Sequence, residues 1–281
     1  MITTYVFVPG SFSNSFMFGP LVREVALHGH RALAVDLPGH GYAAGYSAAY
    51  QAPQDLAAWA TAPSAQAGVT LADTVEATVD VVRRAAAHGP VVLVAHSRGG
   101  LTATGVANRV PDLLHHLVYA SAWCCVDTTP AEYHASAENA GSVLDRTIGA
   151  AVGNPAELGA LRFNYRTGDP AVLAALHEAL LADGTEAEML AFLNTLEPDE
   201  NLDGGGMADR ADPATWGTVA RTYVRFTADR SLPVELQDRF IAEADRAVPG
   251  RPFAVRSLDA SHVGPLVRPG ELAELLVGLA G

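Results

Sequence analysis

The chain has 281 residues, 49% of them hydrophobic, which is enough apolar material for one large core or a core with an inserted subdomain. Its formal net charge of -13 disfavours nucleic acid as a partner, because phosphate binding needs a basic surface. All 18 fixed cations are arginines, so Schiff-base chemistry and a phosphate-loop lysine are excluded.

No stretch approaches the roughly 18 consecutive apolar residues of a membrane-spanning helix. The opening residues, MITTYVFVPGSF, lack the basic start and the cleavage site of a secretory signal. We therefore expect a cytoplasmic protein, a monomer or homodimer, with no membrane partner. The adjacent Cys124 and Cys125 lack further ligands at metal-binding spacing, so we predict two reduced thiols and no metal.

In the first part of the chain, short apolar runs alternate with helical patterns. Continuous apolar strands separated by helices are typical of a parallel sheet that is covered on both faces. The predicted strands are residues 4–8, 32–37, 91–96 and 116–122, and the predicted helices are residues 18–28, 71–87 and 99–109.

This alternation stops between residues 123 and 217, where helical segments occur without a convincing buried strand. It then resumes with strands at 222–228 and 253–258, a helix at 233–247 and a final helix from residue 269. We therefore predict a mostly parallel α/β core made of residues 1–122 and 218–281, with residues 123–217 inserted as a helical lid over a pocket.

Ser97 lies in VVLVAHSRGG, between an apolar strand and a helix that opens at Gly99. A nucleophile on such a turn has strained backbone dihedrals, and small residues two positions before and after it make room for the turn. Here these are Ala95 and Gly99, so alanine replaces the first glycine of the usual G-x-S-x-G pattern. The alternative is an ordinary serine helix cap. We predict that Ser97 is a nucleophile.

A serine hydroxyl needs a general base, and ten histidines compete for that role. His262 follows the last predicted strand, at the carboxyl edge of the sheet where sites form in open α/β folds. Asp229 follows the preceding strand at the same edge and is predicted to orient His262. Two other carboxylates remain candidates for the acid: Asp127, after the preceding core strand, and Asp259, three residues before His262.

An oxyanion hole requires two backbone N–H groups aimed at the developing negative charge. We predict those of Arg98, directly after the nucleophile, and of Ser11, presented by the turn at Gly10 after the first strand. The Arg98 side chain is expected either to form a structural salt bridge or to pair with an acidic substrate.

Further residues are predicted to contact the substrate. Those nearest the nucleophile are Phe12, His96, Trp123, Cys124 and Val263. The lid aromatics either contact an apolar or aromatic substrate or only pack the lid; they are Tyr133, Phe163, Tyr165, Phe192 and Trp216.

The chain resembles α/β-hydrolases of the branch that holds plant methyl esterases, hydroxynitrile lyases and many bacterial small esterases. The matching segments are VPGSFSNSF, DLPGHG, AHSRGG, YVRFTADRSLP and SHVGPLVRPGELAELL, which span the chain apart from the lid. The resemblance implies an α/β-hydrolase fold, a Ser97–His262–Asp229 triad, no cofactor and a small-molecule substrate selected by the lid.

Two positions depart from that branch. The first loop reads Pro9-Gly10 where relatives have His-Gly, so the loop is expected to be held differently. Val263 stands where the lyases have a lysine, which disfavours cyanohydrin cleavage. Hydrolases of this fold that open epoxides or remove halides use an aspartate nucleophile, which Ser97 disfavours.

We therefore expect a serine esterase that forms an acyl-enzyme with a small apolar or aromatic substrate. The resemblance suggests secondary metabolism, for example hydrolysis of a polyketide ester in antibiotic biosynthesis. The alternatives are the same triad used for carbon–carbon hydrolysis, acyl transfer or a lyase step, and a non-catalytic small-molecule binding protein.

Overall fold

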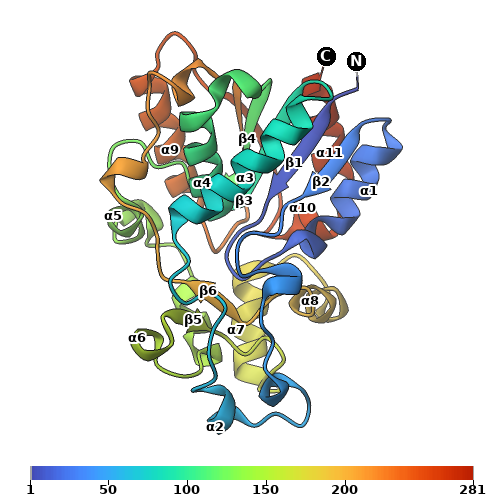
Figure 1. Ribbon diagram of the computed structural model, residues 1–281, viewed down its shortest axis with the longest axis vertical. Coiled ribbons are helices and arrows are strands. Elements are labelled where there is room, and N and C mark those ends of the chain that lie inside the picture. The colour runs from blue at the N-terminus through green and yellow to red at the C-terminus, as the bar shows by residue number, and fades with distance from the viewer. Residues whose placement is uncertain (1, 281) are drawn as a thin grey trace.

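The computed structural model describes residues 2–280, in which six strands form one sheet in the order β2-β1-β3-β4-β7-β8 (Figure 1). All five neighbouring pairs are parallel, as predicted. The central strands are buried on both faces, which explains their continuous apolar sequences. The strands are β1 (Thr4–Val8), β2 (Arg31–Ala34), β3 (Val91–Ser97), β4 (His116–Ala122), β7 (Arg221–Phe226) and β8 (Ala254–Leu258).

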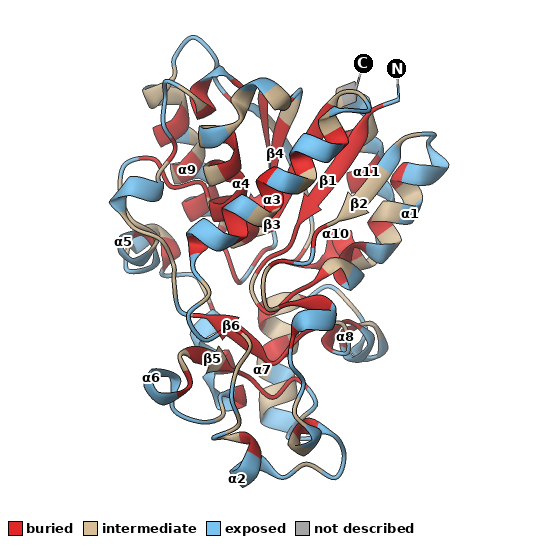
Figure 2. Cartoon of the chain, viewed as in Figure 1, coloured by how far each residue is buried: buried red, intermediate tan, exposed pale blue. Residues whose placement is uncertain are grey.

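Helices cover both faces of this sheet (Figure 1). Alternate residues of β3 belong to two different apolar clusters, with Leu93 in one and Val92 in the other. The Leu93 cluster includes side chains of α3 (Leu71–Ala86), α4 (Gly99–Arg109) and α9 (Val234–Ala247). The Val92 cluster includes side chains of α1 (Gly19–Leu27), α10 (Gly264–Val267) and α11 (Gly270–Val277). Figure 2 shows the resulting band of buried residues along β1 and β3.

The inserted lid lies beyond the carboxyl ends of the strands (Figure 1). Its helices are α5 (Pro130–His134), α6 (Pro155–Leu158), α7 (Pro170–Leu180) and α8 (Glu186–Leu193). It also contains an antiparallel pair, β5 (Ala160–Arg162) with β6 (Asp199–Asn201), so the expectation of no strand there was wrong. These three-residue strands carry no apolar alternation. A buried ion pair, Arg162 Nε and Nη2 to Asp199 at 2.7 Å each, joins them instead.

The segment between β2 and α3 also contacts the lid, although its sequence placed it with the core. It contains the short helix α2 (Leu56–Trp59). Arg162 of the lid donates to the carbonyl oxygens of Trp59 and Ala62, while Asn164 and Gln54 exchange side-chain hydrogen bonds of 2.9 and 3.0 Å. Among residues 2–280, no helix has both the length and the apolar character to cross a membrane.

Candidate active site

The candidate site lies where the strand order reverses, between β1 and β3. In open α/β sheets, ligands bind at such a switch point, outside the carboxyl ends of the strands. Ser97 ends β3 with a φ of +53°, in the left-handed region that a non-glycine residue rarely adopts. Close packing fixes this turn, because a Cβ on Gly99 would lie 2.5 Å from the carbonyl oxygen of Pro9.

Three predicted residues form a continuous hydrogen-bonded chain. His262 Nε2 lies 3.0 Å from Ser97 Oγ, and His262 Nδ1 lies 2.6 Å from Asp229 Oδ2. Both His262 and Asp229 are buried. With Nδ1 donating to the carboxylate, Nε2 is left free to accept the serine proton, which is the arrangement that a general base requires.

Asp229 also accepts hydrogen bonds from three donors other than His262. Ser121 Oγ donates to Oδ2 at 2.6 Å, and the backbone N–H groups of Ser231 and Leu232 donate to Oδ1 at 2.7 and 2.8 Å. Ser121 has a positive φ of +40° and is completely buried at the end of β4. Sequence reasoning missed it, and the only available signal was a serine between two alanines at the end of a buried strand.

The two other candidate acids lie elsewhere. Asp127 forms a surface ion pair with Arg246, and Asp259 accepts a 3.3 Å hydrogen bond from Thr227 Oγ1. In the part of the chain that the structure describes, neither carboxylate hydrogen-bonds to His262. The geometry therefore favours Asp229.

His96 supports the loop that carries His262. Its Nε2 donates to the His262 carbonyl oxygen at 2.8 Å, and the two rings lie 4.6 Å apart. Burial, together with the charge of His262, lowers the pKa of His96 well below its usual value. A neutral imidazole in this position does not compete with His262 as a base, and its donated hydrogen bond fixes the tautomer.

The loop after β1 approaches the nucleophile closely. A Cβ on Gly10 would lie 2.8 Å from Ser97 Cβ, so only glycine leaves room for this contact. Gly10 thereby brings Ser11 beside the nucleophile. Within residues 2–280, the backbone N–H groups of Ser11 and Arg98 donate no intramolecular hydrogen bond, so both remain available to an oxyanion.

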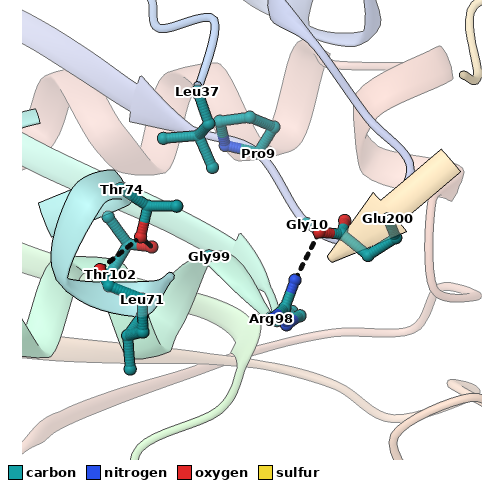
Figure 3. Close-up of a pocket in the computed structure, with 9 residues that line it drawn as sticks. All are labelled: Pro9, Gly10, Leu37, Leu71, Thr74, Arg98, Gly99, Thr102 and Glu200. Atoms are coloured by element: carbon teal, nitrogen blue, oxygen red, sulfur yellow. Dashed lines mark hydrogen bonds and ion pairs between the residues drawn. The ribbon is translucent and has the colours of Figure 1, made fainter. Parts of the chain in front are cut away.

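The Arg98 side chain forms an ion pair with Glu200 of the lid strand β6 (Figure 3). Its Nη1 lies 2.5 Å from Glu200 Oε1, and its Nη2 donates to Asn201 Oδ1 at 2.8 Å and to the Asp203 carbonyl oxygen. Of the two expectations for this side chain, the geometry supports the structural salt bridge.

A cavity of about 740 Å³ opens over Ser97 and His262. Phe12, His96, Trp123 and Val263 line it, but Cys124 does not, so that prediction was wrong. Cys124 is fully buried in the apolar cluster that contains α3, α4 and α9. Trp123 packs against the same cluster but is only partly buried and reaches the cavity, whereas Cys124 is enclosed.

The five predicted lid aromatics fall into two groups. Phe163, Tyr165 and Phe192 line the cavity, whereas Tyr133 and Trp216 do not. The Tyr133 ring packs edge-on against Phe240 of α9, and Trp216 Nε1 donates to the Tyr119 hydroxyl at 2.8 Å. These two side chains pack against core residues and do not line the cavity.

Comparisons with known proteins place this geometry in a family. The sequence matches the alpha/beta hydrolase family over residues 5–275, whereas no curated protein sequence matches it. A pyrethroid hydrolase from Sphingobium faniae JZ-2 is similar, with 21% identity and a TM-score of 0.72 over 100% of this chain and 98% of that one.

Two further solved structures share this fold. Polyneuridine aldehyde esterase has 20% identity and a TM-score of 0.72 over 100% of both chains. An extracellular alpha/beta-hydrolase from a Paenibacillus species has 17% identity and a TM-score of 0.68 over 99% of this chain and 98% of that one. With a family match across nearly its whole length, the chain belongs to the alpha/beta hydrolase family.

Proposed function

We propose that this protein is a serine hydrolase that cleaves a carboxylic ester of a small, neutral, largely apolar substrate. The observation that carries this proposal is the hydrogen-bonded chain from Ser97 through His262 to Asp229 at the base of the cavity. Two of the similar structures are named as a pyrethroid hydrolase and a polyneuridine aldehyde esterase, which agrees with ester hydrolysis.

In this mechanism Ser97 Oγ attacks the ester carbonyl carbon while its proton passes to His262 Nε2. The carbonyl oxygen becomes an oxyanion and accepts hydrogen bonds from the N–H groups of Ser11 and Arg98. His262 then protonates the departing alcohol, which leaves an acyl group on Ser97. A water molecule, deprotonated by His262, releases the acid, while Asp229 keeps the proton on His262 Nδ1 throughout.

The cavity supports a bulky, uncharged substrate. Its volume of about 740 Å³ is typical of pockets for drug-sized molecules, and its lid side is apolar. Among the described lining residues, Arg98 is the only arginine and is already paired with Glu200, and the exposed His134 lies 3.8 Å from the carboxylate of Asp145. No cation therefore remains to bind a substrate carboxylate among the described lining residues. The lid residues that form this apolar wall are Leu161, Phe163, Tyr165, Leu176, Leu180, Phe192 and Leu196.

A natural substrate of this kind would be an aromatic or polyketide ester from secondary metabolism. The family resemblance supports this finer proposal, and so does the aromatic cluster of Phe12, Phe163 and Tyr165, whose rings lie 5.1 to 5.9 Å apart at the cavity. Aromatic side chains bind planar apolar groups through offset or edge-on contacts.

The test is hydrolysis of p-nitrophenyl acetate and of a graded series of aryl esters by Ser97→Ala. We expect at least a ~1,000-fold loss of kcat/KM with the fold retained by circular dichroism. Ser257→Ala, an exposed serine whose hydroxyl contacts Arg225, is the matched control. Activity of Ser97→Ala within tenfold of the parent would contradict the proposal.

Mass spectrometry of the protein mixed rapidly with substrate separates the alternatives. Ester hydrolysis and acyl transfer predict an acyl adduct on Ser97, while a lyase step that uses His262 only as a base predicts none. A binding protein would show neither an adduct nor turnover.

A further inference from the structure

Strand β6 of the lid meets the core through a cluster of four charged side chains. Glu197 and Glu200 come from the lid, His40 from the loop after β2, and Arg98 from the turn after Ser97. The His40, Glu197 and Glu200 side chains are at most 7% exposed, and that of Arg98 is 22% exposed. None of these contacts belongs to the hydrogen-bonded chain of the proposed triad.

This cluster contains two basic and two acidic side chains. Burial alone would lower the pKa of His40, but hydrogen bonds to Glu197 and Glu200 and their charges raise it to about 9. Burial would raise the pKa of Glu200, but Arg98 and His40 lower it to about 2. At neutral pH, Glu200 is therefore a full carboxylate held between two cations, which offsets the cost of burying it.

The lid forms hydrogen bonds to both backbone polar groups of Phe12, which lies in the loop after β1. Glu200 Oε2 accepts the Phe12 N–H at 2.8 Å, and the Glu197 N–H donates to the Phe12 carbonyl oxygen at 2.8 Å. Phe12 has a φ of +57°, a left-handed conformation that is unfavourable for a non-glycine residue. The two hydrogen bonds from the lid hold the residue after Ser11 in this conformation.

The same carboxylate joins both parts of the proposed oxyanion hole. Glu200 Oε2 holds the peptide that links Ser11 to Phe12, and Glu200 Oε1 accepts the hydrogen bond from the Arg98 side chain. Figure 3 shows Glu200 of β6 facing both Gly10 and Arg98. From the core side, Pro9 offers neither an N–H nor a polar side chain to hold this loop.

We propose that Glu200 is a positioning residue for catalysis, holding the N–H groups of Ser11 and Arg98 at the spacing that the oxyanion requires. This inference rests on the proposed ester hydrolysis. It assigns to the lid a part in stabilising the transition state as well as in lining the cavity.

The test is Glu200→Gln, which retains the shape but leaves one acceptor oxygen where the two carboxylate oxygens now accept from Phe12, Arg98 and Asn201. We expect kcat to fall by about 100-fold, the loss typical of one misplaced oxyanion donor, while KM changes less than about threefold. A trifluoromethyl ketone forms a tetrahedral adduct with Ser97, so its affinity should fall in parallel with kcat/KM.

Asp199→Asn is the matched control, because it breaks a buried carboxylate–arginine pair on the same strand without touching the loop after β1. Both variants should lose thermal stability, but Asp199→Asn should retain its kcat and its affinity for the ketone. A kcat of Glu200→Gln within threefold of the parent would overturn the proposal.

A double variant, Glu200→Leu with Arg98→Leu, covers the case in which Glu200→Gln fails to fold. It removes both charges together, so no unpaired charge stays buried, but the Phe12 N–H still lacks its acceptor. We expect its kcat to remain low; parental kcat would show that only charge balance matters and would overturn the inference. A failure of the proposed ester hydrolysis would be recognised separately, because Ser97→Ala would then retain its activity whatever the Glu200 variants do.

Discussion

The core and the lid fix the polar groups of the site in different ways. In the core, Ser97 ends a parallel strand, Asp229 and His262 each follow one, and sheet register brings the three together. In the lid, β6 is three residues long and is held to the core by buried charges. Backbone pairing positions the side chains of the proposed triad, whereas we propose that ion pairs and hydrogen bonds from the lid position the loop that faces them.

This difference has a physical consequence. A hydrogen-bonded sheet distributes strain over many backbone bonds, so changing one side chain leaves its register intact. A buried ion pair concentrates its free energy in two groups, and removing one leaves the other charge uncompensated. The lid side should therefore respond to pH and to charge substitutions, while the core side should respond to changes in steric bulk.

The largest expected effect comes from bulk on the core side, in Gly10→Ala. The new Cβ would lie 2.8 Å from Ser97 Cβ, so the loop with Ser11 must move away from the nucleophile. We predict a loss of kcat of about 100- to 1,000-fold, measured by steady-state ester hydrolysis. Gly270→Ala, where a Cβ would meet nothing within 4 Å, is the control. Parental activity of Gly10→Ala would place the oxyanion site elsewhere.

The second prediction tests the charges of the lid through His40→Asn. The folded-state pKa of His40, about 9, lies above its ordinary value of 6.5, so its stabilising contribution is complete below about 6.5 and is lost as the pH rises through 9. We predict a decrease of the unfolding free energy by roughly 3 kcal/mol near pH 6.

Urea unfolding of parent and variant at about pH 6 and about pH 10 measures this difference. It should shrink strongly at the higher pH, where His40 is neutral in the parent as well. An equal difference at both pH values would mean that His40 contributes through packing and not through its charge.

The smallest expected effect is that of Asp127→Asn, which loses only a surface ion pair with Arg246. Exposed pairs contribute about 0–1 kcal/mol, so we predict a kcat within about twofold of the parent and nearly unchanged stability. Asp229→Asn, measured alongside it, should lose most activity. If Asp127→Asn lost most activity and Asp229→Asn did not, Asp127 would be the acid, and the position of Asp229 after β7 would not explain the site.

The strands and helices of the core could be predicted from sequence because each is specified by a short, continuous pattern of residues. Apolar runs such as VVLVAH predict buried parallel strands, and parallel strands bring their carboxyl ends to one edge. The prediction that Ser97, Asp229 and His262 meet there combined the order of the strands with the small residues around Ser97 and with the family resemblance. The helices of the core carry equally local patterns, such as the capping box of Thr70 and Asp73 before α3.

The contacts of the lid could not be predicted in the same way. The run DEN, which forms β6, has the composition of a solvated loop, and its partners lie far away in sequence. Arg98 is 102 residues from Glu200, and Trp59 is 103 residues from Arg162. The only sequence signals were an arginine directly after Ser97 and a histidine in DLPGHG.

The burial of the two cysteines makes the protein convenient for spectroscopic labelling. Burial raises the pKa of Cys124 to about 12 and that of Cys125 well above its usual value, so both thiols resist alkylation at neutral pH. Ile148, by contrast, lines the cavity and is 64% exposed. A cysteine placed there would be the single reactive thiol, so one fluorophore or spin label would report on the lid while both native cysteines remain in place.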